Sequence, residues 1–148
     1  MDEGIKQLNQ QLSTHANHGE DVIYALEFLN PAADFYVEIG QAGKAVTIWD
    51  NYIAMVNPFV TRNPEDTSSL GYLSYAYERR GDALAVYQYP QNNFAQTNIS
   101  NLRAALTSYQ AGIDRRHRIL QLDPTNQAHI DAEKILALKI SRLKERLG

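Results

Sequence analysis

Cysteine is absent from this chain, and its absence excludes disulfide bridges and thiolate metal sites. A large excess of one charge is lacking too, because 14 Lys and Arg residues stand against 17 Asp and Glu residues. A charge this evenly balanced produces no long-range field that attracts a protein to nucleic acid or to an anionic membrane surface. We therefore expect no nucleic-acid partner, and we expect any partner to be recognised by shape.

Long apolar runs are also missing. No stretch approaches the ~20 apolar residues that a membrane-spanning helix needs, and Met1–Leu12 has no basic start followed by an apolar segment. We expect no membrane insertion and a cytoplasmic location, unless Met1 stands inside a longer protein with a targeting segment upstream. The 148 residues are expected to form one domain, since a chain of this size buries roughly two thirds of its unfolded surface.

No constellation of catalytic residues is apparent, because the sequence has neither a phosphate-binding glycine loop nor a nucleophile elbow. We expect a non-enzyme without a cofactor. His15 and His18, followed by Glu20 and Asp21, have the residue types of a metal site. The pair lies in a predicted break between helices and lacks the glutamate between the histidines of a helical zinc motif. A solvated loop is the favoured interpretation, and a metal-binding or enzymatic domain is the least favoured alternative.

One stretch occurs twice, as Ala45–Asp66 and again as Ala105–Asn126. In each copy an aromatic residue follows the first alanine by four positions, Trp49 in one and Tyr109 in the other, and an isoleucine follows four positions later. This spacing predicts an amphipathic helix closed by a turn, made twice. The identical positions are Ala45 and Ala105, Thr47 and Thr107, Ile53 and Ile113, and Pro64 and Pro124.

Helical periodicity covers most of the chain. The predicted helices are 2–16, 21–39, 43–62, 68–88, 98–122 and 128–147. Pro31 predicts a stop or kink at Asn30, and Pro58 predicts a kink or an early end near Asn57. No stretch alternates polar and apolar residues long enough to indicate a strand. The domain is therefore predicted to be all-α, with antiparallel helices and short connections.

Residues Leu29–Arg62 resemble a tetratricopeptide repeat, in which large, small and aromatic residues recur along two helices. Tyr52 departs from the pattern where a small residue is usual, and Asn57 occupies the usual proline position. The matching residues are Leu29, Ala32, Ala33, Tyr36, Gly40, Ala45 and Trp49.

A second unit of this family covers residues 77–126. Its start, Tyr77–Leu84, resembles the first helix of repeats in large bacterial signalling proteins, although Arg80 replaces the usual leucine. Extra residues around Tyr89–Ser100 separate the two helices of the unit, and Leu122–Asn126 is similar to the turn between such repeats. The matching positions are Tyr77, Gly81, Leu84, Ala105 and Tyr109.

The resemblance implies an α-solenoid of about two antiparallel helix hairpins with a capping helix at each end. The expected segments are an N-terminal helix over 1–19, repeats over 29–62 and 77–126 with an inserted loop at 89–100, and a capping helix over 127–148. Small residues at Ala33, Ala45, Gly81 and Ala105 are expected to let helices approach closely, with Trp49 and Tyr109 filling the space beside them. A generic helical bundle is the alternative.

The resemblance also implies a non-catalytic scaffold or adaptor that binds a partner protein or peptide in a groove lined by the first helix of each unit. The candidate groove residues are Tyr36, Tyr72, Tyr75, Arg79, Asp82 and Tyr87. Tyrosine suits such a surface because it contributes broad contact area at low entropy cost. The alternative is that some of these tyrosines pack against a neighbouring helix.

Two further surfaces are candidates for contacts with a partner. The basic run Arg115–Arg118 offers Arg115 and Arg118 to an acidic peptide or a phosphate, although a helix turns its four side chains in different directions and Arg116 falls where the first copy has Val56. The C-terminal helix offers leucine and isoleucine side chains to a second copy of the chain, which predicts a homodimer as the alternative function. These side chains are Leu136, Ile140, Leu143 and Leu147.

Overall fold

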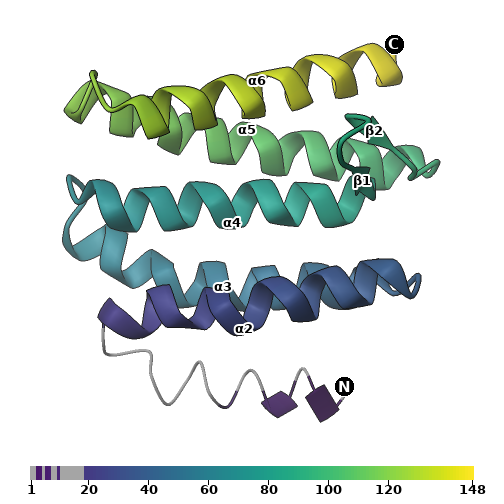
Figure 1. Ribbon diagram of the computed structural model, residues 1–148, viewed down its shortest axis with the longest axis horizontal. Helices are drawn as coiled ribbons and strands as arrows, with labels where there is room; N and C mark the ends of the chain where they lie inside the picture. The colour runs from purple at the N-terminus through teal and green to yellow at the C-terminus, as the bar shows by residue number, and fades with distance from the viewer. Residues whose placement is uncertain (1–2, 5, 8–9, 11–18) are drawn as a thin grey trace.

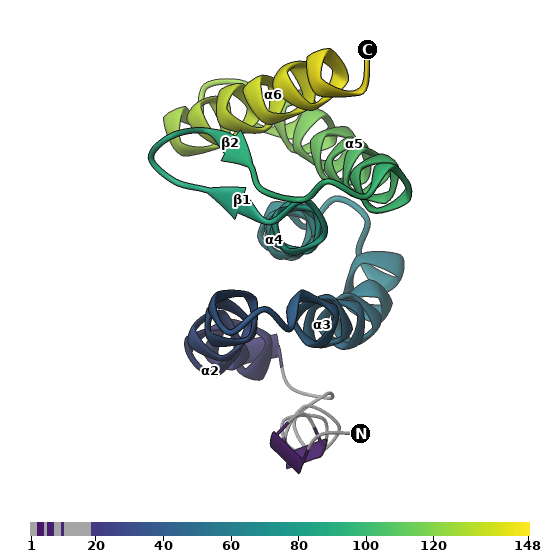
Figure 2. The same cartoon turned by 90° about the vertical axis from the view of Figure 1, so that its right-hand side faces the viewer.

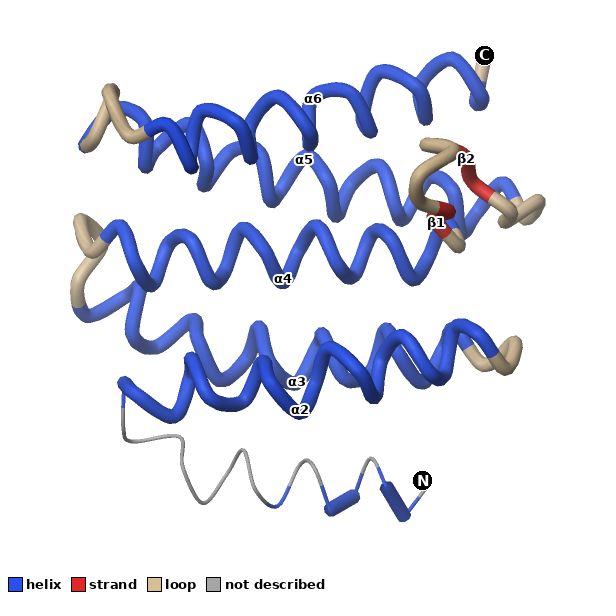
Figure 3. Tube along the Cα trace, in the orientation of Figure 1, coloured by secondary structure: helices blue, strands red, loops and turns tan. Residues whose placement is uncertain are grey.

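The computed structural model describes residues 3–4, 6–7, 10 and 19–148 of the chain. Within residues 19–148 the helices are α2 (Gly19–Glu38), α3 (Ala42–Arg62), α4 (Thr67–Ala85), α5 (Ile99–Leu122) and α6 (Gln127–Leu147). They run in alternating directions and form a stack in which each helix packs on the next one along the chain (Figures 1 and 3). The prediction of an all-α class is confirmed.

The N-terminal helix expected over 1–19 lies for the most part outside the described residues. Residues 3–4, 6–7 and 10, which are described, are helical. No helix in the described part of the chain has both the length and the apolar character needed to cross a membrane.

The duplicated sequence corresponds to a duplicated turn. Asn63 after α3 has φ −142° and ψ 79°, and Asp123 after α5 has φ −142° and ψ 73°. Asp66 then accepts a hydrogen bond from the backbone N–H of Ser68 at 3.1 Å, and Asn126 accepts one from Ala128 at 3.1 Å. A side-chain acceptor at this position satisfies a backbone donor that the following helix leaves unpaired. The repeated sequence therefore produces the same connection twice.

The repeated helices also present their small and aromatic residues to the core as predicted. Ala45 and Ala105 are both 0% exposed, Trp49 is 1% exposed and Tyr109 is 0% exposed. A Cβ atom built on Gly81 would lie only 2.6 Å from the Tyr109 ring. α4 and α5 can approach as closely as they do only because Gly81 has no side chain.

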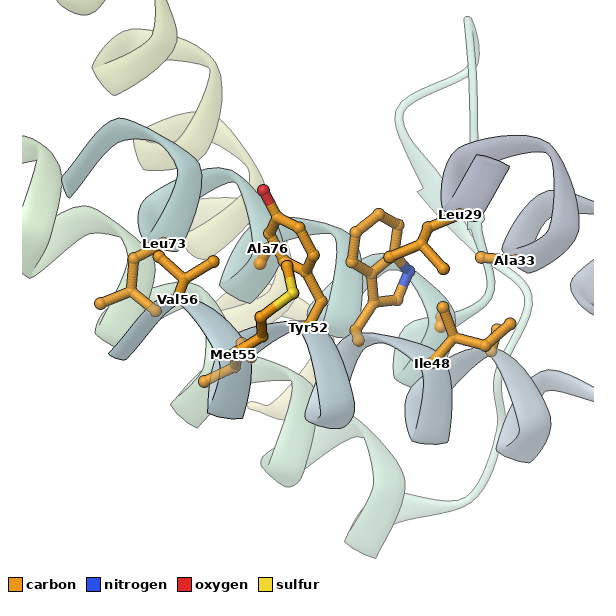
Figure 4. Packing of buried hydrophobic residues seen from close by; sticks show 12 residues of the cluster. Leu29, Ala33, Ile48, Tyr52, Met55, Val56, Leu73 and Ala76 are labelled. Atoms are coloured by element: carbon orange, nitrogen blue, oxygen red, sulfur yellow. The ribbon is translucent and has the colours of Figure 1, made fainter. Parts of the chain in front are cut away.

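The core consists of two clusters that meet along α4. The first fills the space between α2, α3 and α4, where Figure 4 shows Leu29 and Ala33 beside Ile48, and Val56 beside Leu73. The second lies between α5, α6 and the end of α4, and it contains Leu102, Tyr109, Leu136 and Leu143. α4 is therefore packed on both sides.

Two prolines lie inside helices without ending them. α2 continues through Pro31 and α3 continues through Pro58, so neither helix stops or ends early there, and the alternative of a kink at each proline stays a prediction. A proline inside a helix costs about 3 kcal/mol because it removes one backbone hydrogen bond and crowds the preceding turn. Apolar side chains beyond each proline pack on the first core cluster, Ala33 at 1% exposure after Pro31 and the half-buried Phe59 and Val60 after Pro58, and this packing offsets part of the cost.

The prediction that α4 would extend to Gln88 was also wrong. Val86 has φ +50°, a left-handed conformation that ends the helix after Ala85. Tyr87 therefore belongs to a strand, β1 (Tyr87–Gln88), which pairs antiparallel with β2 (Asn93–Phe94). Figure 2 shows this ribbon next to the end of α4 and below α6.

The ribbon begins just before the segment expected to be an inserted loop at 89–100 and includes its first part. Side chains hold the ribbon in place. Phe94 is 4% exposed and packs between Tyr87 and Tyr109. Arg146 of α6 donates hydrogen bonds to the carbonyl oxygens of Phe94, at 2.9 Å, and Gln96, at 3.2 Å. Burial of the Phe94 ring explains why the chain turns back here instead of continuing as a helix.

Candidate functional site

A cavity of about 510 Å³ lies beside α4, with walls from α2, α3, α4, the ribbon segment and α6. We call it the acidic groove because carboxylates outnumber cations in its described lining. Its aromatic lining is Trp49, Tyr75, Tyr87 and Tyr89, and its charged lining is Asp34, Glu38, Glu78, Arg79, Asp82 and Lys139.

Asp82 is the centre of a buried network at the base of the groove. Its carboxylate accepts hydrogen bonds from the Tyr109 hydroxyl at 2.7 Å and from the Lys139 ammonium at 3.0 Å. Lys139 also donates to Glu78 at 2.5 Å, and its side chain is only 7% exposed. Charges this deeply buried are stable only when their partners are held in place, so this network fixes α4, α5 and α6 relative to one another.

The network changes the protonation of two of its members. Burial lowers the pKa of Lys139, but the carboxylates of Asp82 and Glu78 more than reverse this, so its pKa lies above the ordinary value. Burial, followed by the charge of Asp82, raises the pKa of Tyr109 far above its ordinary value. Lys139 is therefore charged and Tyr109 neutral at neutral pH.

Arg79 joins α4 to α2 at the side of the groove. It pairs with Asp34 of α2 and with Asp82, which lies 3.5 Å away, and its guanidinium lies 5.7 Å from the centre of the Trp49 ring. Burial lowers its pKa, but Asp82 and Asp34 outweigh this effect and raise the pKa above the ordinary value. The wall of the groove is thus fixed by ion pairs before any ligand arrives.

The described lining carries more negative than positive charge. Asp34, Glu38, Glu78 and Asp82 stand against Arg79 and Lys139, which leaves two carboxylates in excess. Glu38 is exposed at the end of α2. A concave surface with excess carboxylates attracts cationic ligands.

Four of the predicted groove residues surround this cavity, namely Tyr75, Arg79, Asp82 and Tyr87. Tyr87 reaches it from the ribbon rather than from the expected helix. Tyr72 lines a second cavity, which also borders Tyr75. Tyr36 is half-buried and packs against the first core cluster, with Lys44 5.4 Å from its ring centre. Some of the predicted tyrosines therefore line a cavity and others pack against the core.

The predicted basic run does not contribute to the acidic groove. The guanidinium of Arg115 stacks 4.8 Å from the centre of the Tyr77 ring, and Arg118 is exposed, 3.8 Å from Glu65. Arg116 is buried at 7% exposure. The four side chains point in different directions, as a helix requires.

Lys139 and Glu78 were missed as site residues. Lys139 lies in the apolar stripe of α6, three positions after Leu136 and four before Leu143, and it is as buried as its neighbours. A lysine on an apolar helical face is a signal that carboxylates approach it from another element. Sequence reasoning could have found Lys139 in this way, but it could not have identified the partners.

The face proposed for a homodimer is used within the chain. Leu136 is 1% exposed, Ile140 9% and Leu143 0%, and Leu147 packs against the same cluster. These side chains are not available to a second copy. The apolar residues that α6 exposes are Ile135 at 53% and Leu138 at 43%.

The candidate metal residues His15 and His18 lie outside the described residues, as do the side chains of Glu20 and Asp21. Among the described residues, no group of three His, Cys, Asp or Glu side chains is placed to hold a metal ion.

Comparisons of the chain with protein-family models, with curated proteins and with solved structures find no match. The resemblance to tetratricopeptide repeats therefore stays a prediction.

Proposed function

We propose that this protein is a non-catalytic interaction scaffold, a divergent relative of the tetratricopeptide repeats, and that its acidic groove binds a basic segment of a partner protein. One observation carries this proposal. The groove combines an excess of carboxylates with aromatic side chains, and one of these, Tyr89, is 83% exposed at its rim. Carboxylates select cationic side chains, and tyrosine rings supply contact area for their apolar stems.

The size and rigidity of the groove favour a short segment. A volume of about 510 Å³ accommodates a few side chains and lies within the ordinary range of ligand pockets. Because Arg79 and Lys139 are already held by Asp34, Glu78 and Asp82, little ordering of the wall is needed on binding.

The residues for a test must be chosen outside the structural network. Tyr75 packs against Trp49 and donates a hydrogen bond to Asn30 at 2.9 Å, and Arg79 carries two ion pairs. Alanine at either position would lower stability as well as binding. Tyr89 and Glu38 are exposed and line the groove, so replacing them tests binding alone.

A display selection of random peptides on the wild-type protein tests the proposal. We expect the selected peptides to be rich in Lys and Arg, and we expect their binding to weaken with salt. Tyr89→Ala and Glu38→Lys should each weaken the best peptide by about tenfold, the effect of losing one aromatic or charged contact. The matched control is Glu27→Lys, an exposed position of α2 that does not line the groove. Peptides without basic residues, or equal binding by Glu38→Lys and Glu27→Lys, would contradict the proposal.

A further inference from the structure

A second cavity of about 490 Å³ is lined by residues near the starts of α4 and α6. These two helices begin at the same end of the stack (Figure 1). We call this second cavity the Arg116 cavity. Its polar lining includes Thr67 and Ser68 of α4, Asn126 and His129 at the start of α6, and Arg116 of α5. Leu26, Tyr72 and Tyr75 form its less polar side.

Arg116 is a buried cation that has no anionic partner among the described residues. Its side chain is 7% exposed, and in the described part of the chain no carboxylate lies within ion-pair distance of it. Nη1 lies 2.7 Å from Nδ1 of His129, while Nε is buried and has no hydrogen-bond partner among the described residues. Nε of Arg79 is likewise buried without a hydrogen-bond partner among the described residues, but Arg79 has two carboxylates beside it. Burial of an unpaired charge is costly, so such a group calls for a compensating anion.

The charge of this side chain is retained. Burial lowers the pKa of Arg116, and the more distant Glu78 only partly opposes this effect. An arginine nevertheless stays protonated at neutral pH, because its ordinary pKa is so high. The guanidinium therefore keeps all of its N–H groups, one of which, on Nη1, is directed at His129 Nδ1.

The other groups around Arg116 are also suited to an anion. Thr67 and Ser68 begin α4 and Asn126 caps α6, so two helices direct their positive ends towards the cavity. The described lining contains no Asp or Glu. Two carboxylates lie just outside the described lining: Asp66, the N-cap of α4, accepts from Ser68 and Ser69, and Asp123, the C-cap of α5, accepts from the Asn126 side-chain amide.

The fold itself does not require a cation at this position. Arg116 corresponds in the duplicated stretch to Val56, which is 0% exposed in the first copy. An apolar side chain thus occupies the equivalent buried position in the first copy of the helix. The arginine imposes a desolvation cost that the repeat architecture avoids in its other copy, which favours a role in binding.

We propose that the Arg116 cavity binds an oxyanion, a phosphate or a carboxylate, carried on a small apolar body. The guanidinium of Arg116 pairs with the oxyanion, and the hydroxyls at the start of α4 donate to it. The body lies against Leu26 and Tyr72, because the cavity is much larger than an oxyanion alone. This site is independent of the acidic groove, from which it differs in charge and in all lining residues except Tyr75.

Titration calorimetry of the wild-type protein with three aromatic probes tests the proposal directly. Phenyl phosphate and benzoate share a ring and differ in the oxyanion, and phenol provides the ring without one. We expect phenyl phosphate, benzoate or both to bind at least about tenfold more tightly than phenol, the worth of one charge-assisted hydrogen bond. The tighter of the two identifies the source of the oxyanion. Failure of both anions to bind at about 10 mM, or equal binding of phenol, would overturn the proposal.

Variants separate ligand binding from a structural role of Arg116. Arg116→Met should reduce anion binding by at least about tenfold while the melting temperature is unchanged or higher, because an apolar side chain replaces an unpaired buried charge. Arg118→Met on the same helix is the matched control, since Arg118 is exposed and does not line the cavity. Unchanged anion binding in Arg116→Met would overturn the proposal, and so would equal losses in the two variants.

A second variant keeps the test valid if Arg116→Met fails to fold. Gly71 lines the cavity, and a Cβ atom there would lie 3.7 Å from His129 Cε1 and 3.9 Å from Arg116 Nη1, which are ordinary contacts. A Cβ atom is therefore accommodated at this position, and we expect the rest of the side chain in Gly71→Leu to extend into the cavity and obstruct it. We expect this variant to reduce anion binding and to leave binding of basic peptides to the acidic groove unchanged. Full anion binding by folded Gly71→Leu would contradict the site.

Discussion

Two glycines of α4 have different surroundings, and the difference can be measured. Gly81 faces the Tyr109 ring, whose Cε1 and Cδ1 atoms would lie 2.6 and 2.7 Å from an added Cβ. Tyr109 is 0% exposed and hydrogen-bonded to Asp82, so the ring cannot move aside. Gly71 has no atom nearer than 3.7 Å to an added Cβ. The same substitution should therefore have opposite effects at the two positions.

We predict that Gly71→Ala stabilises the protein by about 0.4–1 kcal/mol, because alanine restricts the unfolded chain and favours a helix. Gly81→Ala should destabilise it by about 1–3 kcal/mol or more, because the core is overpacked. Urea unfolding of both variants measures these free energies. A loss of stability in Gly71→Ala, or none in Gly81→Ala, would contradict the packing described between α4 and α5.

His129 should give the protein a pH dependence near neutrality. Burial, followed by the charge of Arg116, lowers its pKa below the ordinary value of 6.5, and Asp123 only partly opposes this. The folded-state pKa thus lies below that of the unfolded chain, so the unfolded state binds more protons between the two values. Above the unfolded-state pKa, neutral His129 makes its full contribution to the free energy of unfolding. That contribution is lost as the pH falls from the unfolded-state pKa to the folded-state pKa.

We predict that the unfolding free energy of the wild-type protein falls between about pH 7.5 and pH 5.5, and that His129→Gln falls less. Urea titrations of both proteins at the two pH values give the comparison. The same decrease in both would show that other groups cause the pH dependence and that His129 is not held neutral by its surroundings.

At the scale of the elements, the ribbon between α4 and α5 is attached to α6 by one distant side chain. Arg146 of α6 donates to the carbonyl oxygens of Phe94 and Gln96. The backbone amides of Ala95 and Gln96 in turn donate to Val86 and Ala85. Replacing Arg146 therefore weakens the attachment of the ribbon and removes no contact between two helices.

We predict that Arg146→Ala accelerates hydrogen exchange at the amides of Ala95 and Gln96 by roughly tenfold, the worth of one or two hydrogen bonds. Amides inside α3 and α4 should exchange as in the wild type. Arg142→Ala, an exposed position one turn earlier on α6, is the control. Equal exchange in the two variants would show that the ribbon is held by Phe94 alone.

Most of the helices and turns could be predicted from the sequence. The features that depend on tertiary packing could not. The helices and the turns at Asn63 and Asp123 follow from local periodicity and capping, so they could be predicted. The helices continue through Pro31 and Pro58 because burial outweighs a local cost, which no local rule reveals. α4 ends at the left-handed Val86, and the ribbon that follows is held by the packing of Phe94 on Tyr109 and by Arg146, contacts that no local rule reveals.

For the acidic groove too, some lining residues could be predicted from the sequence and others could not. Tyr75, Arg79 and Asp82 could be predicted because they lie at successive turns on one helix. Their partners Asp34 and Lys139 could not be identified as partners, because 45 and 57 residues separate them from Arg79 and Asp82. Pairing over such distances is a property of the helical stack and not of the local sequence.

At the scale of the whole molecule, α4 lines two cavities of opposite character, one towards its start and one towards its end. The acidic groove carries an excess of carboxylates among its described lining residues, whereas the Arg116 cavity carries one cation and no carboxylate among its own. Tyr75 borders both and donates its hydroxyl to Asn30. Ion pairs join α4 to α2 through Arg79, to α3 through Arg80 and to α6 through Glu78.

The most direct test of the proposed function is a chemical-shift map of the isotope-labelled protein during titration with a selected basic peptide. We predict that the largest shifts occur at residues 34–38 of α2, at residues 75–82 of α4 and at Tyr87 and Tyr89, and that Glu38→Lys reduces them. Shifts centred on the outer face of α6, at Ile135 and Leu138, or around Arg116, would contradict the claim that the acidic groove is the binding site.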